Sequence, residues 1–138
     1  MSSGYLVDTC AAIWLSQREQ IADEARYALR RAWRDGISVS VSAITAWEMA
    51  MLVAKGRINK TKPPLRWYAD FLQMAQISEC QVNAELFIAS CFLPGALHND
   101  PADRIVIATA REYDLTIITR DRAILAYGAA GHVKTLAC

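Results

Sequence analysis

Short strand-type runs alternate with helix-type segments along this sequence, and this alternation restricts the fold more than any other feature. The patterns predict strands at residues 5–7, 37–41 and 115–119, with edge-strand candidates at 80–82 and 133–135. They predict helices at about residues 18–35, 43–55, 65–76, 83–92 and 101–113, a short helical turn from Ala11 and a short helix after Asp121. Strands that alternate with helices favour a parallel sheet covered on both faces. The chain is therefore predicted to have an α/β fold.

The length and composition of the chain are typical of one globular domain. No linker divides the 138 residues, so we expect residues 1–138 to form a single domain. The four cysteines include no CxxC pair, which favours a reduced, cytoplasmic environment. No apolar run approaches the roughly 20 residues that span a bilayer, and the first residues lack a signal-peptide pattern. We therefore expect a cytoplasmic protein without a membrane partner.

Two aspartates follow predicted strands. Asp8 comes directly after residues 5–7, and Asp121 comes two positions after residues 115–119. Ligands of open parallel sheets bind beyond the carboxyl ends of the strands, near the place where the strand order reverses, so both carboxylates are candidates for one site. Each also has a structural explanation, because Asp8 could cap the turn from Ala11 and Asp121 could cap the helix after it.

Two further acids belong to predicted helices. Glu48 and Thr45 are the only polar residues between positions 43 and 54, and a carboxylate in apolar surroundings needs a basic partner or a cation. The alternative for Glu48 is partial exposure beside Lys55 or an arginine. Asp103 lies in the first turn of a helix that Asp100 caps, where an acid also stabilises the positive end of the helix.

A shared location for these acids would indicate a cation. Four carboxylates gathered at one edge of a sheet repel one another and are rarely assembled for stability. Oxygen ligands suit Mg²⁺, with Mn²⁺ as the alternative, and an open acidic site of this kind suits a phosphodiester substrate. The ion would neutralise the cluster, activate a water and offset charge on the leaving oxygen. The predicted catalytic and metal-binding residues are Asp8, Glu48, Asp103 and Asp121.

Neighbouring polar residues could support such a site. Thr9 and Thr119 lie close to the strand-end acids, where a hydroxyl could hold a water or cap the backbone. Capping alone explains Asp100. His98 could contact the substrate, although fixing its own loop is the favoured interpretation.

The overall charge of the chain does not attract nucleic acid. The formal net charge is +1, so a local basic patch would have to contact the phosphates of any RNA. The candidates for such contacts are Lys55, Arg57, Arg104, Arg120 and Arg122. The alternative is ordinary surface charge.

The order of these motifs resembles PIN-domain ribonucleases of the VapC toxin type, the toxic halves of prokaryotic toxin–antitoxin pairs. The resemblance covers nearly the whole chain. Its motifs are YLVDT at residues 5–9, SAITAWEMA at 42–50, the stretch from His98 through DPADR at 100–104 to IATA at 107–110, and TRD at 119–121. Such toxins vary in the region after Gly56, so the RNA target stays open.

The resemblance implies a three-layer α/β/α PIN-like fold with a central parallel sheet. It also implies Mg²⁺- or Mn²⁺-dependent endonucleolytic cleavage of RNA, with Asp8, Glu48, Asp103 and Asp121 as metal-binding acids and Thr119 in support. The implied partners are a cognate antitoxin and a second copy of the chain. Two alternatives are a catalytically inactive PIN-like binding module and a metal-dependent nuclease or phosphatase outside toxin–antitoxin systems. A complete set of four acids argues against the first of these alternatives.

Overall fold

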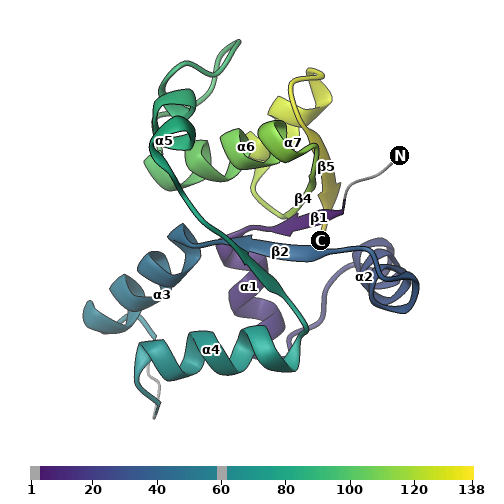
Figure 1. Cartoon of the computed structure of the whole chain (residues 1–138), viewed down its shortest axis with the longest axis vertical. Coiled ribbons are helices and arrows are strands. Elements are labelled where there is room, and N and C mark those ends of the chain that lie inside the picture. The colour runs from purple at the N-terminus through teal and green to yellow at the C-terminus, as the bar shows by residue number, and fades with distance from the viewer. Residues whose placement is uncertain (1–3, 59–61) are drawn as a thin grey trace.

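Five parallel strands form the centre of the structure, a computed structural model that describes residues 4–58 and 62–138 (Figure 1). The strands are β1 (Tyr5–Val7), β2 (Val39–Ser42), β3 (Ser78–Cys80), β4 (Thr116–Thr119) and β5 (Lys134–Ala137). Every pairing is parallel, and the order across the sheet is β3-β2-β1-β4-β5. The predicted parallel sheet is confirmed. Residues 59–61, which belong to the region expected to vary between such toxins, lie outside the described residues.

Helices cover both faces of this sheet. They are α1 (Thr9–Ser16), α2 (Asp23–Asp35), α3 (Ile44–Ala54), α4 (Pro64–Met74), α5 (Ala84–Cys91), α6 (Pro101–Tyr113) and α7 (Arg122–Ala129). Figure 1 shows α5, α6 and α7 on one side of the sheet and α1, α3 and α4 on the other. None of the helices within residues 4–58 and 62–138 is long and apolar enough to cross a membrane.

Side chains of the neighbouring strands β1 and β4 point alternately into two cores. Leu6 of β1 and Ile117 of β4 pack with Val106 of α6. The next residues along, Val7 and Ile118, belong to the opposite core, which α1, α2, α3 and α4 complete. Because adjacent residues of a strand face opposite sides of a sheet, both faces of this sheet are buried. The predicted three-layer α/β/α architecture is confirmed.

The predicted boundaries of the first two helices were wrong. Residues 9–16 form a complete helix, α1, rather than a short turn from Ala11. The helix expected from residue 18 begins at Asp23, and Arg18 has a left-handed φ of 58°. Because a residue in this conformation interrupts a right-handed helix, the chain turns there before α2 begins. α2 ends at the predicted glycine, Gly36, whose φ is 72°.

The boundaries of other elements differ from the predicted ones by one or two residues, as two strands illustrate. Ser42 is the last residue of β2, and its Oγ accepts the backbone N–H of Ile44 at 3.2 Å in the first turn of α3. The edge strand expected at residues 80–82 is β3 at Ser78–Cys80, because its pairing with β2 aligns Ser42 with Cys80. The order and type of the predicted elements are otherwise those of the structure.

Candidate active site

The carboxyl ends of β1 and β4 lie side by side, where the strand order reverses. From β1 the chain builds β2 and β3 on one side and then β4 and β5 on the other, an arrangement that opens a crevice at the strand ends. A pocket of about 270 Å³ lies at this place. It is lined by Asp8, Thr9, Cys10, Ile13, Glu48, Met51, Leu52, Lys55, Arg57, Asp103 and Asp121. The structure therefore brings the four predicted acids to one pocket.

A single hydroxyl joins the two acids that follow the strands. Thr119 Oγ1 is buried, donates a hydrogen bond to Asp8 Oδ2, and accepts the backbone N–H of Asp121 at 2.9 Å. The other oxygen of Asp8 accepts the N–H of Ala11 at 2.8 Å, and Asp121 Oδ1 accepts the N–H of Ile124 at 3.0 Å. Both acids thus cap helices, and both also line the pocket. The two interpretations left open by the sequence are compatible.

Burial governs the protonation of Asp8. Removal from water raises the pKa of its carboxyl, and the charge of Asp121 raises it further. Hydrogen bonds from Thr119 and Ala11 oppose this rise. The charged form of Asp8 therefore lacks enough positive charge nearby.

Glu48 enters the pocket from α3 and is held by α1. Thr9 Oγ1 donates a hydrogen bond to Glu48 Oε1. Thr9 Oγ1 also lies 3.0 Å from Thr45 Oγ1. Burial raises the pKa of Glu48, the hydrogen bond from Thr9 opposes this rise, and the charges of Asp100 and Asp8 add to it. Within the described residues no ion pair joins Glu48 to a lysine or arginine, so the pairing with Lys55 considered from the sequence is not formed.

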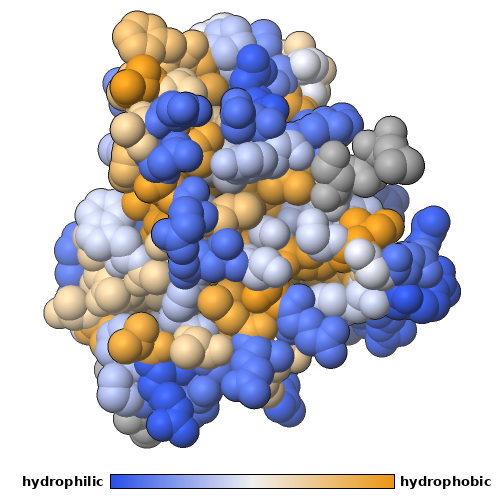
Figure 2. All heavy atoms as spheres, in the orientation of Figure 1, coloured by the Kyte–Doolittle hydropathy of each residue, from blue (hydrophilic) through white to orange (hydrophobic). Residues whose placement is uncertain are grey.

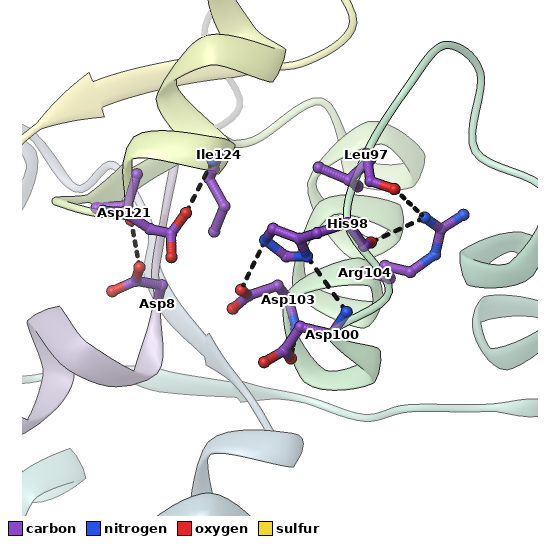
Figure 3. Close-up of polar contacts among 9 residues, drawn as sticks. Asp8, Leu97, His98, Asp100, Asp103, Arg104, Asp121 and Ile124 are labelled. Atoms are coloured by element: carbon purple, nitrogen blue, oxygen red, sulfur yellow. Dashed lines mark hydrogen bonds and ion pairs between the residues drawn. The ribbon is translucent and has the colours of Figure 1, made fainter.

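Asp103 reaches the pocket from the first turn of α6. Asp100 caps this helix as predicted, because its Oδ1 accepts the N–H of Asp103 at 3.0 Å. His98 Nε2 lies 3.3 Å from Asp103 Oδ2 (Figure 3). One potential metal-ligating atom from each of His98, Asp103 and Asp121, a ring nitrogen or a carboxylate oxygen, lies within 4.8 Å of the other two. Burial raises the pKa of Asp103 to about 7, and the charges of Asp100 and Asp121 contribute.

This set of donors fits a divalent cation. The pKa values of Asp8, Glu48 and Asp103 are all raised, which indicates that their charged forms are undercompensated. A dication at the pocket would supply the missing positive charge, and carboxylate oxygens are the ligands that hard divalent ions prefer. The residues that could hold the ion are the four acids, and the imidazole of His98 lies within reach of two of them.

Two of the five basic candidates line the pocket. Lys55 and Arg57 lie at the end of α3, where their side chains are exposed. Arg122 is also exposed, at the start of α7. These three cations remain available to a polyanionic ligand.

The other two basic candidates are engaged with the protein itself. Arg120 donates to the carbonyl oxygens of Cys138 at 2.9 Å and Gln20 at 2.8 Å, and its guanidinium carbon lies 3.8 Å from the ring centroid of Trp14. Arg104 donates to carbonyls of the loop between α5 and α6. Both guanidinium groups therefore hold chain segments together, which the sequence pattern did not reveal.

Cys10 lines the pocket and Thr45 contacts Thr9 beneath it, but the sequence pattern did not indicate either as a site residue. Thr45 was detectable as the only polar residue besides Glu48 in its helix, one turn before it. Cys10 follows Thr9 and lines the pocket, where burial raises the pKa of its thiol to about 11 and the surrounding acids contribute. The thiol is therefore protonated near neutral pH and is a poor nucleophile.

A larger pocket lies away from the acids. Its volume is about 330 Å³, and residues of α1 and α4, including Trp67 and Phe71, line it. Its acid, Asp70, is paired with Lys62 at 2.8 Å. A neutralised acid among aromatic side chains offers no cluster for chemistry, so the smaller acidic pocket is the candidate active site.

The fold and the pocket define a class of protein, namely α/β/α domains whose acidic site lies at the carboxyl ends of parallel strands, beside the reversal of strand order. The sequence matches the PIN domain over residues 5–129. The chain belongs to the PIN-domain family, whose nucleases generally use divalent metal ions.

One relative in sequence and two solved structures are similar to this chain. Ribonuclease VapC22 of Mycobacterium tuberculosis is 28% identical over 119 residues, which are 86% of this chain and 88% of that protein. The structure of VapBC2 from Rickettsia felis bound to a promoter DNA fragment has a TM-score of 0.72 at 14% identity, covering 97% of this chain and 98% of that one. FitAcB from Neisseria gonorrhoeae has a TM-score of 0.56 at 25% identity, covering 96% of each chain.

Proposed function

We propose that this protein is a Mg²⁺-dependent endoribonuclease, with Mn²⁺ as the alternative ion, and the toxin of a toxin–antitoxin pair. The observation that carries the proposal is that acids from four separate chain segments line one pocket at the strand ends. Membership of the PIN-domain family and the similarity to Ribonuclease VapC22 support it. We also infer that the chain forms one domain, because all five strands join one sheet.

In this proposal the four acids would hold the cation. A bound cation would supply positive charge that offsets the acids of the pocket and would lower the pKa of a water for attack on phosphorus. Thr119 and Thr9 orient the carboxylates of Asp8 and Glu48 through their hydrogen bonds. Lys55 at the rim contacts neighbouring phosphates, which positions RNA without reading its sequence.

The proposed partners are an RNA substrate, a cognate antitoxin and a second copy of this chain, all met in the cytoplasm. An apolar surface supports the contact with a second copy. Phe87, Ile88 and Phe92 are 49%, 62% and 80% exposed, and Figure 2 shows apolar spheres gathered at the upper left, over α5. A gathered apolar surface of this kind typically marks a protein contact.

The test is cleavage of a pool of structured and unstructured RNAs by wild type and by Asp8→Asn, each with Mg²⁺, Mn²⁺ or EDTA. We expect cleavage by the wild type with metal, none with EDTA, and none by Asp8→Asn. Asp70→Asn is the matched control, because Asp70 lies on α4 outside the acidic pocket and should leave cleavage unchanged.

Each other outcome has a defined meaning. Equal cleavage by wild type and Asp8→Asn that persists in EDTA would point to a contaminating nuclease, whereas equal cleavage that EDTA abolishes would remove Asp8 from the site. No cleavage by antitoxin-free wild type with either metal would refute the ribonuclease proposal and favour a PIN-like binding module.

A further inference from the structure

Arg104 fixes the loop between α5 and α6 at the edge of the pocket. Its Nε donates to the carbonyl oxygen of Ser90 at 2.8 Å, and its Nη1 donates to those of His98 at 3.2 Å and Leu97 at 3.4 Å (Figure 3). A guanidinium is planar and holds its donors in a rigid fork. The backbone of His98 is therefore set relative to the first turn of α6.

The two nitrogens of the His98 ring contact two acidic residues at the start of α6. Nδ1 accepts the backbone N–H of Asp100 at 3.2 Å, and Nε2 lies 3.3 Å from Asp103 Oδ2. A nitrogen that accepts an N–H carries no proton, so a neutral imidazole here carries its proton on Nε2. An N–H, rather than a lone pair, therefore faces the Asp103 carboxylate.

We propose that His98 is a positioning residue of the cation site, whose Nε2–H holds the Asp103 carboxylate toward Asp121. The inference rests on the proposed function to the extent that the pocket must bind a divalent cation. Direct ligation of the ion by Nε2 is the competing role. Ligation by Nε2 would require the ring proton to be on Nδ1. The proton on Nδ1 would then face the backbone N–H of Asp100, and the hydrogen bond from Asp100 to Nδ1 would be lost.

The surroundings of Asp103 explain why it needs this contact. Asp100 and Asp121 act on it as like charges, and within the described part of the chain His98 is the basic side chain recorded beside its carboxylate, at 3.3 Å. Without the Nε2–H the carboxylate can rotate toward solvent and away from Asp121. Residues that orient metal-ligating groups typically change metal affinity by about 10–100-fold when they are replaced.

The test compares Mn²⁺ binding by the whole chain and by His98→Leu and His98→Gln, using calorimetry without RNA. Leucine cannot donate a hydrogen bond, whereas the glutamine amide can. We expect the Kd for Mn²⁺ to rise about 10–100-fold in His98→Leu and to return most of the way to the wild-type value in His98→Gln. His132→Gln, at the other of the two histidines, is the control and should bind Mn²⁺ like the wild type.

Pulsed electron paramagnetic resonance of the Mn²⁺-loaded wild type separates positioning from ligation, even if His98→Leu fails to fold. Positioning predicts no hyperfine coupling from a directly bound imidazole nitrogen. A strong coupling that disappears in His98→Gln would overturn the proposal, as would equal Mn²⁺ affinity in wild type and His98→Leu, or no Mn²⁺ binding by the wild type. RNA cleavage is not a readout, so Mn²⁺ binding as expected without cleavage would refute the proposed function alone.

Discussion

Replacing Asp103 by asparagine should stabilise the metal-free protein at high pH. The asparagine keeps the shape of the side chain and an oxygen that can face His98, but it removes a charge that the pocket does not compensate. The pKa of Asp103 rises from 3.8 to about 7 in the folded protein, chiefly through burial. The folded state therefore binds the proton more tightly than the unfolded state, and ionisation at high pH costs stability.

The size of the effect follows from that pKa. At about 1.4 kcal/mol per pKa unit, the rise sets an upper limit of roughly 4 kcal/mol. The Asp103 side chain is 24% exposed, so solvent screening and relaxation of the pocket reduce the expected gain to about 1–2 kcal/mol. For a chain of this size, that gain corresponds to a Tm higher by about 3–6 °C at pH 8 in EDTA.

The pH dependence tests the sign of this reasoning. The cost of ionising Asp103 is present above its folded pKa and disappears as the pH falls through about 7 toward 4. The difference in Tm between Asp103→Asn and wild type should therefore shrink steadily from pH 8 to pH 5. Thermal unfolding followed by circular dichroism measures it, and added Mg²⁺ should raise the Tm of the wild type more than that of the variant.

A surface aspartate provides the control with the opposite sign. The hydrogen bond from Lys62 lowers the pKa of Asp70, so Asp70→Asn should not stabilise the protein at pH 8. If Asp103→Asn were less stable than wild type at pH 8 in EDTA, or if its advantage did not depend on pH, the charge argument would be wrong.

The hydroxyl of Thr119 and the basic rim lead to the remaining predictions. Thr119→Val should lower the free energy of unfolding by about 1–3 kcal/mol in urea titrations, because Asp8 loses a donor and the Asp121 N–H loses its acceptor. Thr119→Ser keeps the hydroxyl and should recover most of the lost stability. Unchanged stability in Thr119→Val would contradict the bridging role. Lys55→Ala and Arg57→Ala should each weaken binding of every RNA similarly and reduce the salt dependence by about one phosphate contact in anisotropy titrations. Arg31→Ala, an exposed residue of α2, should not do so.

The sequence alone predicted the fold class, the order of the elements and the four acids that the structure brings to one pocket. These follow from local patterns, because apolar spacing over a segment distinguishes strand from helix, and an Asp-Pro pair directly before apolar residues at helical spacing favours a helix start. Boundaries were less accessible. The late start of α2 depends on the left-handed turn at Arg18, which no local pattern announced.

Only the tertiary structure decided which polar groups act together. Arg120 looked like a candidate for phosphate, yet it binds the carbonyl of Gln20, 100 positions earlier in the chain. Thr119 reaches Asp8 across 111 positions, because β1 and β4 are neighbours in the sheet although they are distant in sequence. Whether a side chain is free or occupied depends on such long-range contacts. They arise from the packing of the whole chain, so residue spacing can nominate the members of a site but cannot assign their partners.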